Sequence, residues 1–176
     1  GLVIVGSGVA IYRWKVAQTE LAASNALLEL RTPMNTREQP EPPAASSYLK
    51  VASDFPSTSA AERALLLGAG TLFAEGKYQE ASTQFDRFLQ RYGGHPLAVT
   101  AAFGRVASLE AQGQQDEALR GYQDVIARYP KAALLDEARL AIARIYEFKK
   151  QPQLALQSYE EITRTMDVTV HQVYTA

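Results

Sequence analysis

The sequence predicts an all-α solenoid built from antiparallel helix pairs, and three observations point to it. Alanine and aromatic residues recur at a fixed spacing of 37 residues along the chain. Glycine or lysine recurs at the same spacing a few residues earlier, where a turn would separate two helices. The segments on both sides of each turn carry apolar residues at helical spacing. A period of this length indicates units that must stack on one another to bury their apolar faces.

Composition excludes several classes of protein. The chain has 176 residues, enough for one domain or for a small domain with an appendage. Its 47% hydrophobic and 21% charged residues exclude global disorder, and its formal net charge of −1 argues against a nucleic-acid-binding protein. With no cysteine and two histidines, the chain offers nothing for disulfides, thiolate metal sites or a histidine-rich centre.

Residues 1–12 form an uncharged apolar run that Arg13 and Lys15 close. As a helix the run would cover about 18 Å, less than the ~30 Å hydrocarbon core of a bilayer. Trp14 lies among these flanking charges, as is typical of a membrane interface. We therefore expect residues 1–15 to be the last part of a transmembrane helix whose beginning precedes Gly1.

Two other interpretations of the run are weaker. A signal peptide would be followed by a small-residue cleavage site, and none is present. A dinucleotide-binding turn would use Gly6 and Gly8 after a strand, but its third glycine position is occupied by Ile11. That reading leaves a nucleotide-binding enzyme as the competing class of function.

The next two segments differ sharply in composition. Residues 16–31 are rich in alanine, leucine and glutamate, which predicts a helix that continues from the anchor and packs on residues 44–54. Residues 32–43 hold four of the eight prolines, which predicts a linker. The expected organisation is a partial membrane anchor at 1–15, a helix and Pro-rich linker at 16–43, and a repeat domain at 44–176.

Each repeat unit is expected to contain two helices joined by a turn. Gly76 and Gly113 suit the left-handed residue that ends a first helix, and Lys150 takes the same place in the third unit. Each second helix carries alanine, then an aromatic residue, then an apolar residue: Ala81, Phe85 and Phe88; Ala118, Tyr122 and Val125; Ala155, Tyr159 and Ile162. This spacing places the aromatic residues in the core rather than in a ligand site.

The end of the chain continues the period. A shift of 37 from residues 131–139 gives residues 168–176. We expect a further first helix to begin there, residues 167–176 to pack on the third unit as a cap, and the natural protein to extend beyond Ala176.

At these residues the chain resembles the tetratricopeptide repeat family. The family's second-helix alanine and aromatic residue and its preceding glycine match Ala81, Phe85 and Gly76, and again Ala118, Tyr122 and Gly113; its closing proline matches Pro130. The family's first-helix Trp and Gly are absent. The resemblance covers about residues 44–166 and implies a tetratricopeptide-like solenoid of three full units with partial end units.

Two further features resemble a bacterial envelope branch of that family. The Tyr129-Pro130 junction and the long unit look like outer-membrane assembly lipoproteins and the coordinator linked to the Tol–Pal system. The apolar run before an Ala-rich helix is similar to the ancillary subunit of the Sec translocon. That resemblance implies a single-pass inner-membrane protein with periplasmic repeats, which handles exported proteins beside chaperones. An outer-membrane assembly or cell-division-linked envelope scaffold is the alternative.

No catalytic, cofactor-binding or metal site is expected, because the sequence has no Ser/His/Asp order, P-loop or acidic metal cluster. The family resemblance implies that function lies in a concave groove lined by first helices, with a protein or peptide as partner. Its expected lining is Arg63, Leu66, Phe73, Phe103, Glu110, Leu140, Arg144 and Glu147. Exposed Phe and Leu side chains would suit an apolar peptide or helix. The sequence leaves the partner's identity and the oligomeric state open.

Overall fold

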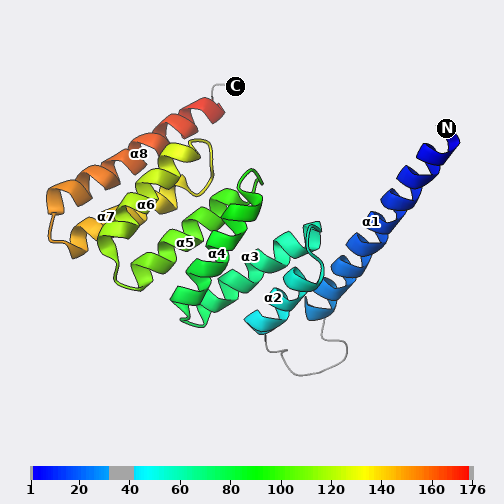
Figure 1. The fold of residues 1–176 in the computed structure, drawn as a ribbon. Helices are drawn as coiled ribbons and strands as arrows, with labels where there is room; N and C mark the ends of the chain where they lie inside the picture. The colour runs from blue at the N-terminus through cyan, green and yellow to red at the C-terminus, as the bar shows by residue number, and fades with distance from the viewer. Residues whose placement is uncertain (1, 32–41, 175–176) are drawn as a thin grey trace, which may run out of the picture. The chain divides into compact units, whose positions relative to one another are not determined.

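The computed structural model describes residues 2–31 and 42–174, and these residues form eight α-helices (Figure 1). No strand occurs within those two ranges. The chain divides into two compact units, residues 1–92 and residues 93–176. The all-α solenoid-type organisation of paired helices predicted from the period is confirmed within each unit.

Unit 1 contains four helices in chain order: α1 (Leu2–Arg31), α2 (Ala45–Asp54), α3 (Ser59–Ala74) and α4 (Tyr78–Tyr92). The helix expected over residues 16–31 is present as the C-terminal half of α1. It packs on α2 and α3, where Ala23 and Leu27 are buried. The predicted packing across the Pro-rich segment is therefore confirmed.

Two side chains satisfy the free N–H groups at the start of α3. Thr58 is the N-cap, and its Oγ1 accepts a hydrogen bond from the Ala61 amide at 3.0 Å. Glu20 of α1 accepts from the amides of Ser59 at 3.0 Å and Ala60 at 3.3 Å. An acidic group at a helix N-terminus also complements the helix dipole. This contact fixes where α1 sits on the first unit.

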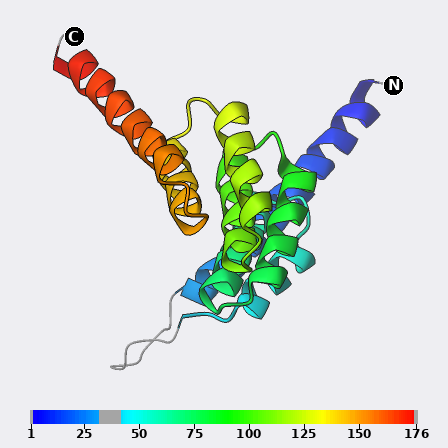
Figure 2. The ribbon, with the colours of Figure 1, turned by 90° about the vertical axis from the view of Figure 1, so that its left-hand side faces the viewer.

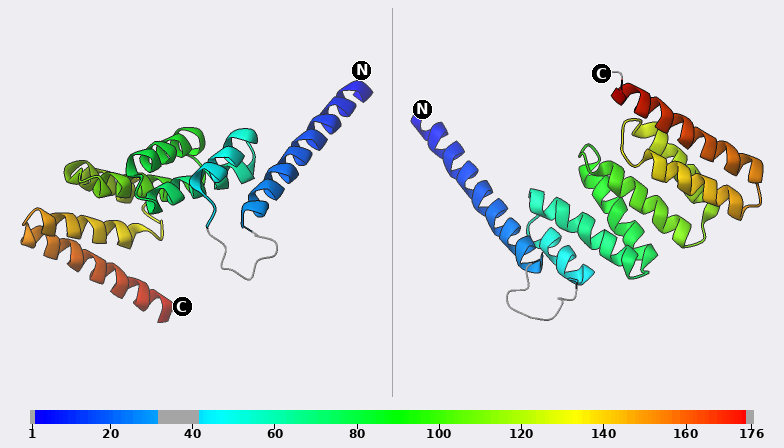
Figure 3. Two further views of the ribbon diagram at one scale, coloured as in Figure 1. Left: turned by 90° about the horizontal axis from the view of Figure 1, so that it is seen from below. Right: turned by 180° about the vertical axis from the view of Figure 1, so that it is seen from behind.

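Unit 2 repeats the paired arrangement with α5 (Ala98–Ala111), α6 (Gln115–Arg128), α7 (Leu135–Phe148) and α8 (Pro152–Tyr174). Consecutive helices of this unit pack side by side (Figure 3). Five of the six predicted core positions of the second helices in this unit are buried: Ala118, Tyr122 and Val125 in α6, and Ala155 and Ile162 in α8. The sixth, Tyr159, is half-buried. The same positions of α4, Ala81, Phe85 and Phe88, are buried in unit 1.

The three first helices end in the same way. Gly76, Gly113 and Lys150 have positive φ angles of 76°, 79° and 58°. At each, two backbone bonds return to the helix. After α3, for example, the Lys77 amide donates to the Leu72 carbonyl at 2.9 Å, and Gly76 donates to Phe73 at 3.0 Å. This pattern is a Schellman motif, so the predicted left-handed turns are confirmed, including the one formed by lysine.

The N-terminal membrane helix is a wrong prediction. α1 is one continuous helix of 30 residues, but no helix in the described ranges is long and apolar enough to cross a membrane. The reason is local: Arg13 and Lys15 end the apolar run after twelve residues, and Glu20 follows. The single-pass inner-membrane localisation is corrected with it. The dinucleotide-binding turn is also not formed, because Gly6 and Gly8 lie inside α1.

The last helix differs from the prediction as well. α8 runs unbroken through Met166 to Tyr174, where a new first helix was expected (Figure 2). No glycine or proline follows Pro152 to stop it. Residues 175–176, and the Pro-rich stretch at 32–41, lie outside the described residues. The domain boundaries at 15/16 and 43/44 stay predictions.

Candidate functional site

A tyrosine, a glutamate, an arginine and a phenylalanine meet in unit 2, and we call them the Glu110 cluster. The Tyr122 hydroxyl on α6 donates to Glu110 Oε2 on α5 at 2.7 Å. Arg144 Nη2 on α7 lies 3.5 Å from Glu110 Oε1. The Phe103 ring packs on the Tyr122 ring with centroids 5.3 Å apart. The Glu110 carboxylate thus connects α5 and α6 of one repeat to α7 of the next.

The charge state of the Glu110 cluster follows from burial. Tyr122 is only 1% exposed. Burial raises the pKa of the Tyr122 phenol, and the hydrogen bond to Glu110 and that carboxylate's charge raise it further. The phenol therefore remains a hydrogen-bond donor at neutral pH. This arrangement orients Glu110 and provides no acid or base poised for catalysis.

The same tyrosine–glutamate pair recurs one period later. Tyr159 on α8 hydrogen-bonds to Glu147 on α7, and burial, then the Glu147 charge, raises the pKa of Tyr159. In unit 1 the corresponding positions are Phe73 and Phe85. The polar pair is thus a feature of unit 2. The 37-residue spacing of the two glutamates was a sequence signal for it, but the tyrosines had been assigned to packing alone.

The structure places the eight predicted groove residues as follows. Arg63, Leu140, Arg144 and Glu147 are exposed, whereas Leu66, Phe73, Phe103 and Glu110 are half-buried. The structure brings three of them together in the Glu110 cluster.

In unit 1, Arg63 Nε donates to the Ser59 carbonyl of its own helix at 3.2 Å. Phe73 packs edge-on against Tyr78 with centroids 5.2 Å apart. Neither contact reaches another predicted groove residue, so the assignment of all eight to one site stays a prediction.

Unit 2 also has a hollow that was not predicted from the sequence. It is an open groove of about 340 Å³ between α6 and α8. Ile142 and Tyr146 of α7 and Leu154 of α8 are among its lining residues. Its lining residues belong to three helices and share no spacing motif, so no sequence pattern indicates this groove.

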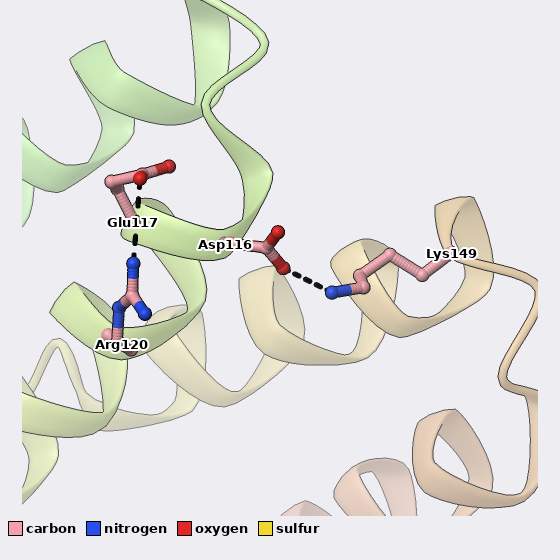
Figure 4. A network of polar contacts seen from close by, with 4 residues as sticks. All are labelled: Asp116, Glu117, Arg120 and Lys149. Atoms are coloured by element: carbon pink, nitrogen blue, oxygen red, sulfur yellow. Dashed lines mark hydrogen bonds and ion pairs between the residues drawn. The ribbon is translucent and has the colours of Figure 1, made fainter.

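Ion pairs support the helix ends near the turn that follows α7. Lys149, directly after α7, pairs with Asp116 in the first turn of α6, and Glu117 pairs with Arg120 at 3.4 Å (Figure 4). The hydrogen bond from Lys149 lowers the pKa of Asp116. The first pair joins the end of α7 to α6, and the second lies within α6; exposed pairs of this kind contribute little to stability. Within the described ranges, no three His, Cys, Asp or Glu side chains are grouped to hold a metal ion.

Comparisons with known proteins agree with this geometry. A family model described as tetratricopeptide repeat matches residues 101–132, which span most of α5 and all of α6. No curated protein matches the chain.

Solved structures match over most of the chain at low identity. A candidate kinesin light chain of Podosopora anserina with nearly identical TPR-like repeats matches with a TM-score of 0.59 at 16% identity, covering 88% of this chain and 76% of its own. MamA of AMB-1 matches with a TM-score of 0.55 at 16% identity, covering 90% and 91%. At this identity the likeness shows the fold alone.

The sequence match thus identifies a tetratricopeptide repeat at residues 101–132, and the solved structures show that the fold of the chain is tetratricopeptide-like. Repeats of this kind are typically non-enzymatic scaffolds that bind protein partners. The bacterial envelope branch implied by the sequence resemblance is not confirmed by these comparisons.

Proposed function

We propose that this protein is a non-enzymatic interaction scaffold whose α5–α7 surface in unit 2 binds a peptide segment of a partner protein. The observation that carries the proposal is the Glu110 cluster, because it holds α5 and α7 together through side chains that are still partly accessible. The Arg144 side chain is 56% exposed and Leu140 is 40% exposed. A preorganised surface loses little conformational entropy when it binds.

The chemistry of this surface favours a peptide with an apolar side chain beside a lysine or arginine. Leu140 and the accessible part of Phe103 offer apolar contact. Glu137 and Glu147 are exposed acidic groups on α7, whereas Arg144 already lies beside Glu110. The exposed acidic groups outnumber the basic one, so a basic peptide is complementary.

Unit 1 carries a second, smaller set of predicted contacts. Arg63 is exposed and Leu66 and Phe73 are half-buried on α3. We propose that they form a separate contact region in unit 1. Their charge differs from that of unit 2, so this region suits a different part of the partner.

The resemblance to bacterial envelope proteins supports a finer form of the proposal. In it, the bound peptides belong to exported proteins that are being folded or assembled. Unfolded segments of such proteins expose apolar side chains that Leu140 could contact. A partner in an outer-membrane or cell-division-linked scaffold is the alternative form.

The proposal is tested by placing a photo-crosslinking amino acid at Leu140 and recovering adducts from intact cells. Asp124, exposed on α6, is the matched control position. Adducts that form at Leu140, are weak at Asp124 and are lost with Glu147→Lys support the proposal. Equal yields at both positions contradict it. Enrichment of exported proteins among the adducts supports the finer form, and enrichment of cytosolic proteins contradicts it.

A further inference from the structure

α1 carries an exposed apolar stripe that the repeats do not use. Ile11, Trp14 and Leu21 are 57%, 62% and 61% exposed. Together with exposed Gln18 and Asn25 they follow alternating steps of three and four residues. That spacing is the a/d pattern of a coiled coil, with Ile11, Gln18 and Asn25 at a and with Trp14 and Leu21 at d.

The stripe faces away from the rest of unit 1. The buried face of α1 is formed by Ala23 and Leu27, which are 0% and 8% exposed against α2 and α3. Glu20 lies on the same face, where it accepts the amides of Ser59 and Ala60. In the same heptad, Glu20 and Leu27 occupy c positions and Ala23 occupies an f position, away from the a/d seam. A second helix could therefore lie along the stripe without displacing α2 or α3.

The N-terminal half of α1 has little support from its own chain. Every residue from Val9 to Thr19 is exposed, and this part of the helix stands clear of α2 and α3 (Figure 3). Helical segments of this length are marginal in water unless an apolar face is packed. Five large apolar side chains are exposed within it: Val9, Ile11, Tyr12, Trp14 and Val16. Of these, Ile11 and Trp14 lie on the a/d stripe, whereas Val9, Tyr12 and Val16 lie at f and b positions on other faces, so a partner helix along the stripe would cover only the first two.

We propose that this stripe pairs with the same stripe of a second copy as a parallel two-stranded coiled coil. Gln18 and Asn25, the polar residues of the stripe, indicate which kind of partner it binds. Amide side chains at a positions are satisfied by their own counterparts when two identical helices lie parallel and in register. Against lipid or a purely apolar surface, Gln18 and Asn25 would be buried without hydrogen-bond partners, which is unfavourable.

The flanking positions agree with pairing of identical helices. Ala17 and Ser24 at g and Ala22 at e are small and uncharged. They allow the two helices to approach closely and place no like charges opposite one another. Lys15 and Glu29 are the charged e residues of the described stripe, and in a parallel pair they face Ala10 and Ser24.

The first test is the oligomeric state of the full 176-residue chain by sedimentation equilibrium. We expect a concentration-dependent dimer, and Trp14→Ala should raise its dissociation constant at least about tenfold. Tyr12→Ala is the matched control, because Tyr12 is 71% exposed on the same helix but at a b position. It should leave the constant unchanged. A monomeric wild type, or equal effects of the two variants, would overturn the proposal.

The second test uses the absence of cysteine from the chain. Leu21→Cys introduces a single thiol at a d position, and Thr19→Cys introduces one at a b position. Under mild oxidation, a parallel in-register pair should link Leu21→Cys into a covalent dimer and leave Thr19→Cys largely monomeric. Equal linking of both contradicts the register. Trp14 fluorescence that shifts with phosphatidylglycerol vesicles while the chain stays monomeric would assign the stripe to lipid and overturn the pairing.

Discussion

Single residues in unit 2 perform tasks that their positions in the repeat alone do not reveal. Tyr122 fills the core position of its repeat, yet its hydroxyl also orients Glu110 at 2.7 Å. Phe85 fills the same position of unit 1 without a hydroxyl. The repeat thus specifies an aromatic ring, and unit 2 adds a polar contact to it.

Tyr122→Phe should lower the free energy of unfolding by about 1.5–3 kcal/mol at pH 7, because Glu110 loses a hydrogen bond to a charged group. The pKa of Tyr122 is raised in the folded state, so its contribution is complete below the unfolded value near pH ~10 and is lost as pH rises further. Urea unfolding between pH 8 and 11 measures both effects. The variant should lose less stability over this range than the wild type, with exposed Tyr12→Phe as control. Parallel pH profiles would show that Tyr122 is not the group responsible.

Lys150 occupies a left-handed position that glycine occupies in the two preceding repeats. Lys150→Gly should stabilise the protein by about 1 kcal/mol, because a side chain in this conformation is strained. The matched reverse change is Gly113→Ala, which should destabilise by a similar amount through backbone strain, since a Cβ there would meet no atom within 4 Å. Thermal unfolding measures both. Changes of the same sign would refute the strain explanation.

At the scale of helices, α5 and α6 are held at close range by a glycine. A Cβ built on Gly121 would lie 2.7 Å from Val106 Cγ2, so Gly121→Ala forces the two helices apart. We expect a loss of about 1–3 kcal/mol in unfolding free energy. Gly70→Ala is the control, because a Cβ at this exposed helical position meets nothing within 4 Å, and the change should stabilise by up to about 1 kcal/mol. A neutral Gly121→Ala would indicate that the helices can move apart freely.

Helix pairs, turns and second-helix cores could be predicted from the sequence because they depend on a local period. Gly76 and Gly113 indicate the positions of their turns, and Ala118 and Tyr122 indicate which face of their helix is packed in the core. The failures have physical causes too. The apolar run was interpreted as the end of a membrane helix because Arg13, Trp14 and Lys15 resemble the flank of such a helix at the membrane interface. α8 was expected to end near Met166 because the period was given more weight than the missing stop residue.

The candidate site was predictable in its residues but not in its contacts. Glu110 and Arg144 were both expected on the groove side, yet only the structure shows that they meet at 3.5 Å across a repeat boundary. Long side chains from different repeats are placed by packing, which a single sequence does not encode locally. The Glu20 contact with the start of α3 is of the same kind, since 39 residues separate it from Ser59.

For the whole molecule, we propose that unit 2 captures a protein partner through the α5–α7 surface. The repeat fold supplies paired helices, and the Glu110 cluster supplies their orientation. In this proposal, the acidic groups Glu137 and Glu147 favour a basic segment. If this account is right, binding depends on charge at that surface and not on charge elsewhere on the unit.

The most direct measurement is the affinity of the partner recovered by crosslinking at Leu140 for two charge-reversed variants. Glu147→Lys reverses a charge on the proposed surface. Glu117→Lys reverses an exposed charge on α6, where Glu117 pairs with Arg120. Isothermal titration calorimetry should show at least about tenfold weaker binding for Glu147→Lys and nearly unchanged binding for Glu117→Lys. Equal affinities for the two variants, both of them still folded, would contradict the account.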